Sequence, residues 1–434
     1  ATDSRRRALA RPWAFQPGDD PPWAAPGFDD SAWPRLRVPG SWLRQGYPDL
    51  AGLAWYRRTV HPGAAPDVML AVTIGKVDSA YEVFAGGRRV GGVGALPPQP
   101  RMESDRHRTY LIPPAAREAD GSVVLAIRIW RNPSKVSSAA GPVEGPFEIG
   151  PFHQLIDRNT LAEAQHLGML MLFLLVSIYH LSLRIRLGSG PDYAWFGILA
   201  LFAAIYGFLR SQLKYAFFDD FYVLKKVEHV VLWVLPATTL QFLWTFFREP
   251  PPRWLRAAQA VLVAGAVAVA VLPGLELALI LLPWLQLAVM PMLAMAIVLV
   301  IRRIAAGDRD ARAVGLAMTL FAATIAHDAL VDRNIILNPR LGLYGFTVLV
   351  IGMSITLGNR FQRALRERDT LLRELESRVE ARTHALNEAY LEMEKRALRD
   401  SLTQVMNRRA VRERGTSELA RARRHGAPFA VAMA

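Results

Sequence analysis

Two pairs of neighbouring carboxylates near the N-terminus have the residue type that glycoside cleavage requires. Asp19-Asp20 and Asp29-Asp30 are the two pairs, and paired carboxylates act as acid and nucleophile or base in sugar hydrolysis. Both pairs stand among proline, glycine and tryptophan residues, where aspartate often closes a turn by bonding to its own backbone. The sequence therefore favours turn formation over catalysis or calcium binding at these positions.

Five tryptophans in the same part of the chain have rings that could stack on a sugar. These candidate ligand-contacting residues are Trp13, Trp23, Trp33, Trp42 and Trp55. Because aromatic side chains bury a large apolar area, we expect most of the five rings in a hydrophobic core.

A third group of polar residues lies inside or beside an apolar segment near the C-terminal third of the chain. His327, Asp328, Asp332 and Arg333 form this candidate polar relay. Ionisable residues within membrane spans are costly and are often functional. Asp332 and Arg333 fall where the segment ends and water can reach them, so a hydrogen bond between helices is the favoured alternative for His327 and Asp328.

The composition indicates a membrane protein. The 434 residues are 52% hydrophobic, and the formal net charge is +14. The arginines flank apolar runs, which is typical of membrane topology rather than nucleic-acid binding. The chain has no cysteine, which excludes disulfides, thiolate zinc sites and thiol nucleophiles. We expect no metal site in this chain.

Residues 1–155 have the pattern of an all-β sandwich. Short apolar runs such as Val68–Gly75 and Ser122–Trp130 are bounded by glycine and proline, as strands are. The stretch "FAGGRRVGG" predicts a hairpin with its turn at Gly86 and Gly87.

Residues 160–360 contain apolar segments that are each close to the length needed to cross a bilayer. We predict seven transmembrane helices near Ala164–Leu183, Tyr193–Gln212, Val230–Phe247, Leu255–Leu272, Leu277–Ile301, Ala313–Leu330 and Leu343–Asn359. No internal repeat divides them into matching halves, which disfavours a transporter. The last segment has no lysine, which excludes retinal Schiff-base chemistry.

Arginines in alternate links predict the orientation. Arginines follow the first, third, fifth and seventh segments, and positive links lie on the cytoplasmic side. The link between the second and third segments runs against this trend, because it contains Lys214, Lys225 and Lys226. We expect the N-terminal domain in the periplasm and the C-terminus in the cytoplasm, across a bacterial inner membrane.

Residues 361–399 are predicted to form a helix with a coiled-coil seam. The seam residues are Leu365, Leu372, Leu375, Val379, Leu386 and Met393. Arg368, Arg382 and Arg396 replace apolar residues at one of the two core positions of the heptad. The pattern predicts a parallel homodimer. Its weak seam fits a rod that shifts between two registers and, equally, a marginal spacer.

The stretch "DSLTQVMNRRA" resembles the opening motif of GGDEF domains, which make cyclic di-GMP. Its matching residues are Asp400, Leu402, Thr403, Asn407, Arg408 and Arg409. Gln404 departs from the pattern, because the family usually has glycine there. The resemblance covers residues 400–434 and implies an α/β fold in which "FAVAMA", Phe429–Ala434, is the first core strand. It also implies that Asp400 pairs with Arg408 or Arg409.

The resemblance implies GTP and Mg²⁺ as substrate and cofactor of a complete GGDEF domain. The family's guanine contacts, metal carboxylates and signature hairpin follow the matched segment, so no catalytic residue is expected in this chain. We therefore expect the 434-residue chain to make no cyclic di-GMP.

Two further resemblances concern the rest of the chain. The seven segments and "AHDALVDRNIILNPRLGLYGF", Ala326–Phe346, are similar to the seven-transmembrane receptors with diverse intracellular signalling modules. The stretches "GDDPPWAAPGFDDSAW" and "GLAWYRRTV" are similar to the galactose-binding-like jelly roll of family 2 glycoside hydrolases.

These patterns predict a multidomain membrane sensor. A periplasmic jelly roll would bind a carbohydrate, another small molecule or a partner, and a cytoplasmic diguanylate cyclase would be the output. The alternative is a non-catalytic receptor or scaffold with a degenerate GGDEF domain. A histidine-kinase output is disfavoured, because "RDSLT" stands where a phosphoacceptor histidine would be expected.

Overall fold

The N-terminal domain is a β sandwich with a jelly-roll-like arrangement of antiparallel strands. It is seen in a computed structural model that describes residues 7–133, 140–332, 335–336 and 340–432, with the Asp332 side chain excepted. The six-stranded sheet has the order β3-β2-β4-β10-β7-β8, and the four-stranded sheet has the order β1-β12-β5-β9. A two-stranded sheet joins β11 to β6.

The strands of the six-stranded sheet are β3 (Arg35–Arg37), β2 (Pro12–Pro17), β4 (Gly52–Val60), β10 (Val123–Arg131), β7 (Ala80–Ala85) and β8 (Arg88–Val93). Those of the other two sheets are β1 (Arg7–Ala8), β12 (Glu148–Pro151), β5 (Leu70–Ile74), β9 (Arg108–Leu111), β11 (Gly141–Glu144) and β6 (Lys76–Asp78). Short 3₁₀ helices η1 (Pro21–Ala24), η2 (Trp42–Arg44) and η3 (Pro114–Ala116) lie in the connections.

The core of the sandwich is formed by the inward side chains of both large sheets. Trp13 and Tyr56 from one sheet pack in the same buried cluster as Val72 and Ile149 from the other. Alternation along each strand brings every second residue to this face. The predicted all-β sandwich is confirmed.

The predicted hairpin turn is also present. β7 pairs with β8, and Gly86 and Gly87 between them have φ values of 53° and 77°. Two successive residues with positive φ make the tight turn that suits the twist of a hairpin.

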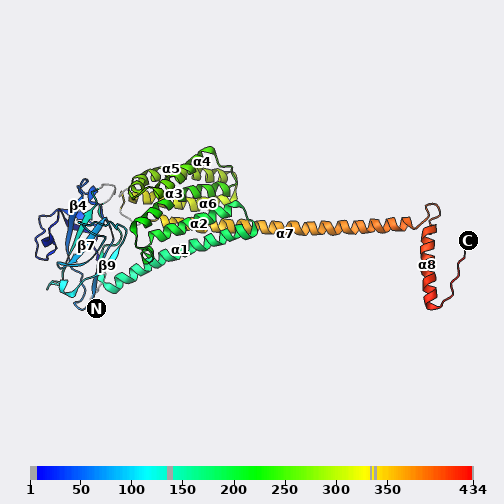
Figure 1. The fold of residues 1–434 in the computed structure, drawn as a ribbon, viewed down its shortest axis with the longest axis horizontal. Coiled ribbons are helices and arrows are strands. Elements are labelled where there is room, and N and C mark those ends of the chain that lie inside the picture. Colours follow the sequence, from blue (N-terminus) through cyan, green and yellow to red (C-terminus); the bar gives the residue numbers. More distant parts are fainter. Residues whose placement is uncertain (1–6, 134–139, 333–334, 337–339, 433–434) are drawn as a thin grey trace. The chain divides into compact units, whose positions relative to one another are not determined.

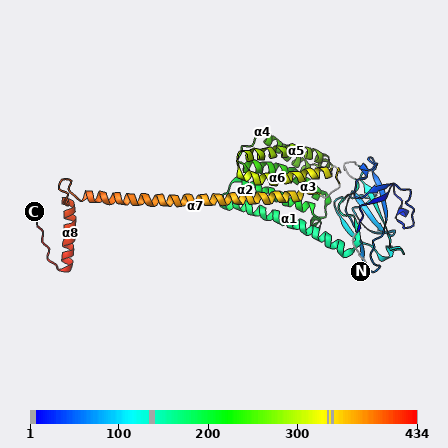
Figure 2. The same cartoon turned by 180° about the vertical axis from the view of Figure 1, so that it is seen from behind.

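Seven helices in the described residues are long and apolar enough to cross a membrane. They are α1 (Phe152–Leu187), α2 (Pro191–Arg210), α3 (Phe221–Phe246), α4 (Arg253–Val271), α5 (Glu276–Ala305), α6 (Arg309–Asp332) and α7 (Gly342–Ala397). They lie side by side, as both views show (Figures 1 and 2), and they confirm the predicted count of spans. A short helix, η4 (Leu213–Ala216), lies between α2 and α3.

Two of these helices extend well beyond the predicted spans. α1 begins at Phe152, directly after β12, twelve residues before the predicted start of the first span. α3 begins at Phe221 because Asp220 caps it, accepting a hydrogen bond from the amide of Val223 at 3.0 Å. Hydropathy detects the apolar part of a helix but not its polar ends, which explains both differences.

The C-terminal unit, residues 358–434, contains the rest of α7 and helix α8 (Arg408–His425). Asn407 caps α8 by accepting a hydrogen bond from the amide of Ala410 at 3.0 Å. The strand that the resemblance to a GGDEF domain implies at Phe429–Ala434 is not formed in residues 429–432, which have no regular structure. A single strand needs a neighbouring strand to bond its backbone, and none is paired with these four residues; Met433 and Ala434 lie outside the described residues.

Candidate functional site

A charged junction joins the β sandwich to the ends of the transmembrane helices. Its centre is Asp105, which lies in the connection between β8 and β9 and is 7% exposed. The Lys214 ammonium in η4 lies 2.6 Å from a carboxylate oxygen of Asp105, and that of Lys225 in α3 lies 3.3 Å away. The hydroxyl of Tyr215 donates to the second oxygen. One carboxylate of the sandwich thus binds the α2–α3 link at two points and the start of α3 at a third.

Neighbouring contacts extend the network of Asp105. Lys225 also pairs with Glu228 at 2.7 Å, and Arg210 at the end of α2 lies 3.3 Å from the other oxygen of Glu228. The side-chain amide of Gln212 donates to the backbone oxygen of Asp105 at 2.9 Å. Buried charges are tolerated when they are paired and hydrogen-bonded in this way.

Arg106, next to Asp105, makes a second contact with the same link. Its side chain donates to the backbone oxygen of Asp219 at 3.2 Å and lies over the Tyr215 ring, 4.0 Å from the ring centre. Glu103 holds the Arg106 guanidinium in place at 3.0 Å. The contact combines a hydrogen bond with a cation–π interaction.

A third contact connects the sandwich to the segment before α7. Glu144 in β11 pairs with Arg340 and with Lys76 in β6, whose ammonium is 3.6 Å away. Arg340 precedes α7 by two residues. The sandwich is therefore linked by charge to the start of the seventh helix as well as to the α2–α3 link.

The charges shift the ionisation of the groups that surround them. Burial alone would raise the pKa of Asp105, but the Lys225 and Lys214 charges and the hydrogen bonds from Lys214 and Tyr215 lower it below its ordinary value. Glu144 follows the same pattern, since Lys76 and Arg340 outweigh burial and lower its pKa. Burial lowers the pKa of Lys76 to about 8, despite the attraction of Glu144.

The first helix continues the sandwich without a linker. β12 ends at Pro151, and α1 begins at Phe152, whose amide donates to the backbone oxygen of Met69 at 2.9 Å. Further along α1, the Asn159 amide donates to the Thr109 hydroxyl at 3.0 Å. The first two turns of α1 are thus fixed to the four-stranded sheet.

The first and last helices are in contact inside the bundle. The rings of Phe173 in α1 and Phe346 in α7 pack edge to face at 5.8 Å. The Tyr193 hydroxyl in α2 donates to the backbone oxygen of Leu357 in α7 at 3.2 Å, and the His180 ring in α1 stacks on Tyr193 at 6.1 Å. Packed side chains therefore connect α1 to α7.

The candidate polar relay of α6 is only partly described. The His327 ring nitrogen Nδ1 lies 3.1 Å from Asp328, whose two carboxylate oxygens accept from the amides of Leu341 and Gly342 at 2.7 and 2.9 Å. Asp328 therefore holds the first turn of α7. The Asp332 side chain and Arg333 lie outside the described residues.

The acidic pairs of the sandwich hold its structure together. Asp19 pairs with Arg128 and accepts from the Trp55 indole at 3.1 Å. Asp30 lies 3.2 Å from the buried Arg57, and Asp29 accepts from the amide of Ser31 at 3.0 Å. Asp20 precedes η1 without capping it through its side chain.

Three of the five tryptophans are in the interior. Trp13, Trp42 and Trp55 are buried, whereas Trp23 and Trp33 are partly exposed. The last two rings pack edge to face at 5.1 Å. Any ring that stacks on a ligand in the present conformation must come from this pair.

The opening motif after α7 is a self-contained turn. One oxygen of Asp400 accepts from the amides of Leu402 and Thr403 and from the Thr403 hydroxyl, at 3.0 to 3.1 Å. These bonds lower the pKa of Asp400. Arg409 pairs instead with Glu413 at 3.0 Å, so the expected pairing of Asp400 with an arginine is replaced by turn formation.

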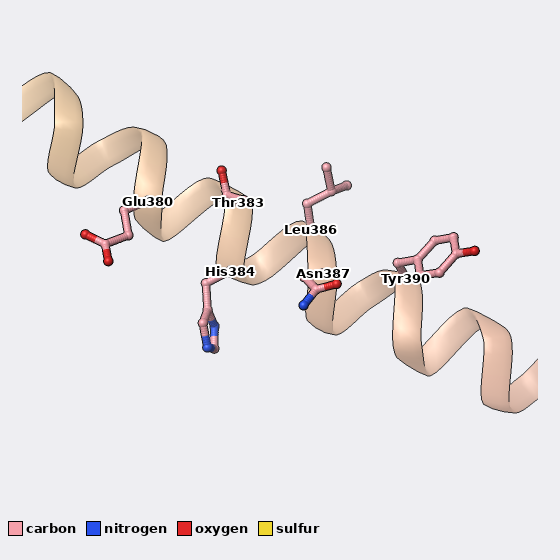
Figure 3. Close-up of a pocket in the computed structure, with 6 residues that line it drawn as sticks. All are labelled: Glu380, Thr383, His384, Leu386, Asn387 and Tyr390. Atoms are coloured by element: carbon pink, nitrogen blue, oxygen red, sulfur yellow. The ribbon is translucent and has the colours of Figure 1, made fainter.

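The predicted seam of α7 is exposed along the single chain. Its six residues, Leu365, Leu372, Leu375, Val379, Leu386 and Met393, have exposed fractions from 37% to 73%. A shallow hollow that includes the seam residue Leu386 is lined by Glu380, Thr383, His384, Leu386, Asn387 and Tyr390. Figure 3 shows these six side chains on α7. All six side chains come from one helix and point away from it, so they do not converge on a ligand as binding-site residues do.

One sign of the charged junction is visible in the sequence. The lysines of the α2–α3 link ran against the arginine trend of the other links, and two of them, Lys214 and Lys225, are the partners of Asp105. Asp105 has no such sign in the sequence, because its partners lie more than a hundred positions away in the chain.

The architecture defines a class: a seven-helix membrane protein with an N-terminal, jelly-roll-like β sandwich. Residues 163–360 match the family model described as 7TM diverse intracellular signalling. This match and the seven apolar helices support a seven-transmembrane receptor.

Comparison with solved structures gives only distant likenesses. A glycosyl hydrolase family 2 member from Bacteroides cellulosilyticus DSM 14838 is 16% identical, with a TM-score of 0.29, over 34% of this chain and 20% of that chain. A Bacteroides vulgatus beta-glycosidase is 19% identical, with a TM-score of 0.27, over 33% of this chain and 20% of that chain. A Bacteroides uniformis beta-glucuronidase is 17% identical, with a TM-score of 0.27, over 33% of this chain and 17% of that chain. The matches span a fifth or less of these enzymes and carry no argument about activity. No curated protein matches the chain.

Proposed function

We propose that the protein is a bacterial inner-membrane sensor that relays a periplasmic signal to a cytoplasmic output. The observation that carries the proposal is the continuous connection from the sandwich to α7. α1 follows β12 without a linker, and it packs against α7 through Phe173 and Phe346. α7 then runs as one helix to Ala397. Movement of the sandwich thereby changes the position of the output helix.

The arginine distribution supports the proposed orientation. α1 starts at the sandwich and has Arg184 and Arg186 in its last turn, and Arg302 and Arg303 end α5. Positive charge at the helix ends away from the sandwich favours a cytoplasmic location for those ends. The sandwich then lies in the periplasm, where it meets a carbohydrate, another small molecule or a partner.

In the proposal, the output is a diguanylate cyclase in the full-length protein. Two α7 helices pair in parallel through the seam, and each GGDEF domain holds one GTP with Mg²⁺. The product needs two GTP molecules, so the geometry of the pair controls synthesis. The exposed seam and the Asp400 turn support this part of the proposal.

The test is synthesis of cyclic di-GMP by the full-length protein in lipid nanodiscs, given GTP and Mg²⁺ and assayed by mass spectrometry. We expect product from the full-length protein and none from the 434-residue chain. The absence of product in a dimeric, ligand-activated preparation would overturn the cyclase output.

A second candidate is a receptor or scaffold whose GGDEF domain is degenerate. Gln404 favours it, because this residue has a φ of 55° where the GGDEF pattern usually has glycine. A side chain in the left-handed region is strained. Nucleotide binding without turnover in the assay above would support this candidate.

A further inference from the structure

The sandwich exposes two large apolar side chains at one edge. In its described part, Met69 and Leu111 are the exposed members of this kind, at 62% and 48%. β5 pairs with β9, so that Leu111 lies opposite Ala71, two residues after Met69. The two exposed side chains are therefore neighbours on one face of the four-stranded sheet.

This apolar edge continues along α1. The Phe152 amide bonds to Met69, and Asn159 bonds to Thr109, two residues before Leu111. On the same part of α1, Ile156 and Leu161 are 37% and 62% exposed. Exposed apolar side chains are thus present on α1 between the sandwich and the apolar span, among exposed polar residues such as Asp157 and Arg158.

The α2–α3 link adds exposed aromatic side chains at the same end of the bundle. Phe217, Phe218 and Tyr222 are 68%, 55% and 44% exposed. The amide of Gln212, close before them, bonds to Glu163 in α1 at 3.1 Å, and Arg106 of the sandwich bonds to the backbone of Asp219. Aromatic side chains at such positions are enriched in the headgroup region of a bilayer.

The length of α1 indicates how far Ile156 and Leu111 lie from the hydrocarbon layer of the membrane. From Leu161 to Leu183 the helix rises about 33 Å, which matches a hydrocarbon layer of about 30 Å. Ile156 lies five residues earlier, or about 7.5 Å along the axis. The headgroup layer on each side is about 5–8 Å thick, so Ile156 and the nearby Leu111 fall within it.

We propose that Met69, Leu111, Ile156, Leu161, Phe217, Phe218 and Tyr222 form an interfacial belt that seats the β sandwich on the lipid surface. Lipid is the partner that fits, because the next turns of α1 expose Leu167, Met171 and Leu175 within the first apolar span. The sandwich is then in direct contact with the membrane, with Leu111 in the headgroup layer and Met69, beside Phe152, on its aqueous side.

The absence of cysteine in the chain allows single spin labels to test the belt. Leu111→Cys and Phe218→Cys are labelled in nanodiscs of phosphatidylcholine. Leu175→Cys in the span is the lipid control, and Arg88→Cys, exposed at the hairpin tip, is the water control. Power saturation with oxygen and with a water-soluble nickel chelate reports the depth of each label.

We expect the oxygen-to-nickel accessibility ratio at Leu111 and Phe218 to be several-fold above that at Arg88 and below that at Leu175. Ratios equal to that at Arg88 would overturn the proposal. Dipolar broadening between labels, with low access to both reagents, would assign the patch to a second copy of the chain and would also overturn it.

A double variant tests whether side chains of the sandwich itself contribute to its contact with the lipid surface. Met69→Ser with Leu111→Ser changes only exposed side chains, so the tryptophan-monitored melting of the sandwich should not change. A label at Ile156 should become several-fold more accessible to nickel. Unchanged access at Ile156 would show that the helices alone set the depth. Neither measurement depends on nucleotide turnover, so the outcome is separate from that of the proposed cyclase.

Discussion

The junction at Asp105 and the seam of α7 use opposite chemistry. At the junction, charged side chains from the sandwich and the helices are paired within one chain, and Lys214 is 1% exposed. Along residues 365–393 of α7, apolar side chains are exposed. A buried ion pair needs its own partner in precise position, whereas an apolar seam can pair in more than one register. The comparison suggests that the sandwich is held in one position on the helices, whereas the pairing of α7 through its seam can change.

The largest effect is expected from removing the central carboxylate. Asp105→Asn leaves Lys214 and Lys225 close together without that charge, so we expect a loss of about 3–5 kcal/mol of stability. Denaturant unfolding of the sandwich in detergent measures it. Asp219→Asn is the matched control, because Asp219 is 96% exposed and 3.8 Å from Arg106.

A double variant sharpens the same test. Asp105→Asn with Lys214→Met removes both members of the closest pair, and replacing both charges is far less costly than removing one. We expect most of the lost stability to return. If the double variant is as unstable as Asp105→Asn alone, the pair is not the source of the effect.

The free energy of unfolding should change with pH on both sides of neutrality, in an acidic limb and in a basic limb. The pKa values of Asp105 and Glu144 are lowered from 3.8 and 4.5 in the folded state. The ionised Asp105 and Glu144 therefore stabilise the folded protein above these pKa values, and this stabilisation is lost as the pH falls below them. Lys76 has a folded pKa of about 8, below its ordinary 10.5. Between pH 8 and pH 10.5 Lys76 is protonated in the unfolded chain and largely neutral in the folded protein, so the free energy of unfolding should rise with pH in that range.

Fluorescence-monitored unfolding from pH 3 to pH 10 measures both limbs. Lys76→Met should remove the basic limb and leave the acidic one. A basic limb that persists in this variant would contradict the assignment to Lys76.

A smaller effect is expected from the seam. Leu372→Ala should weaken dimerisation by about 2 kcal/mol, because it removes a core side chain of the proposed coiled coil. Leu371→Ala is the neighbouring control outside the seam. Disulfide formation by Leu386→Cys measures pairing, since no other cysteine competes. Equal effects of the two alanine variants would rule out the assigned seam.

The turn after α7 offers a gain in stability. Gln404→Gly should stabilise the turn by about 1 kcal/mol, because glycine adopts positive φ at no steric cost. The change is read as slower hydrogen exchange at Leu402 and Thr403. Gly426→Ala is the opposite control, since Gly426 ends α8 with a φ of 61°; it should destabilise α8 by a similar amount.

The smallest effect is expected where α2 meets α7. Tyr193→Phe removes the hydrogen bond to the Leu357 carbonyl and should cost about 0.5–1.5 kcal/mol. Cysteine crosslinking between α2 and α7 measures the loosening. Tyr179→Phe is the control, because this ring is 49% exposed on α1.

The sequence was informative where the pattern is local. Apolar runs located the seven helices, and the Gly86-Gly87 turn located a hairpin, because both depend on neighbouring residues. The junction depends on pairs such as Asp105 and Lys214, whose approach is decided by the tertiary fold. The polar ends of α1 and α3 were missed for the related reason that they are ordered by the sandwich and by the Asp220 cap. The strand at Phe429 is implied by the resemblance to a GGDEF domain, but a strand also requires a neighbouring strand.

The direct step from Pro151 in β12 to Phe152 in α1 also constrains how this architecture can be recombined. Each residue added to an α-helix turns everything after it by about 100°. With no flexible linker to absorb that rotation, an insertion near residue 160 would turn the sandwich out of phase with the charges of the α2–α3 link. A chimera that places another sensor domain on this bundle must therefore conserve helical phase, and only exchanges in whole turns of α1 would keep the two parts aligned.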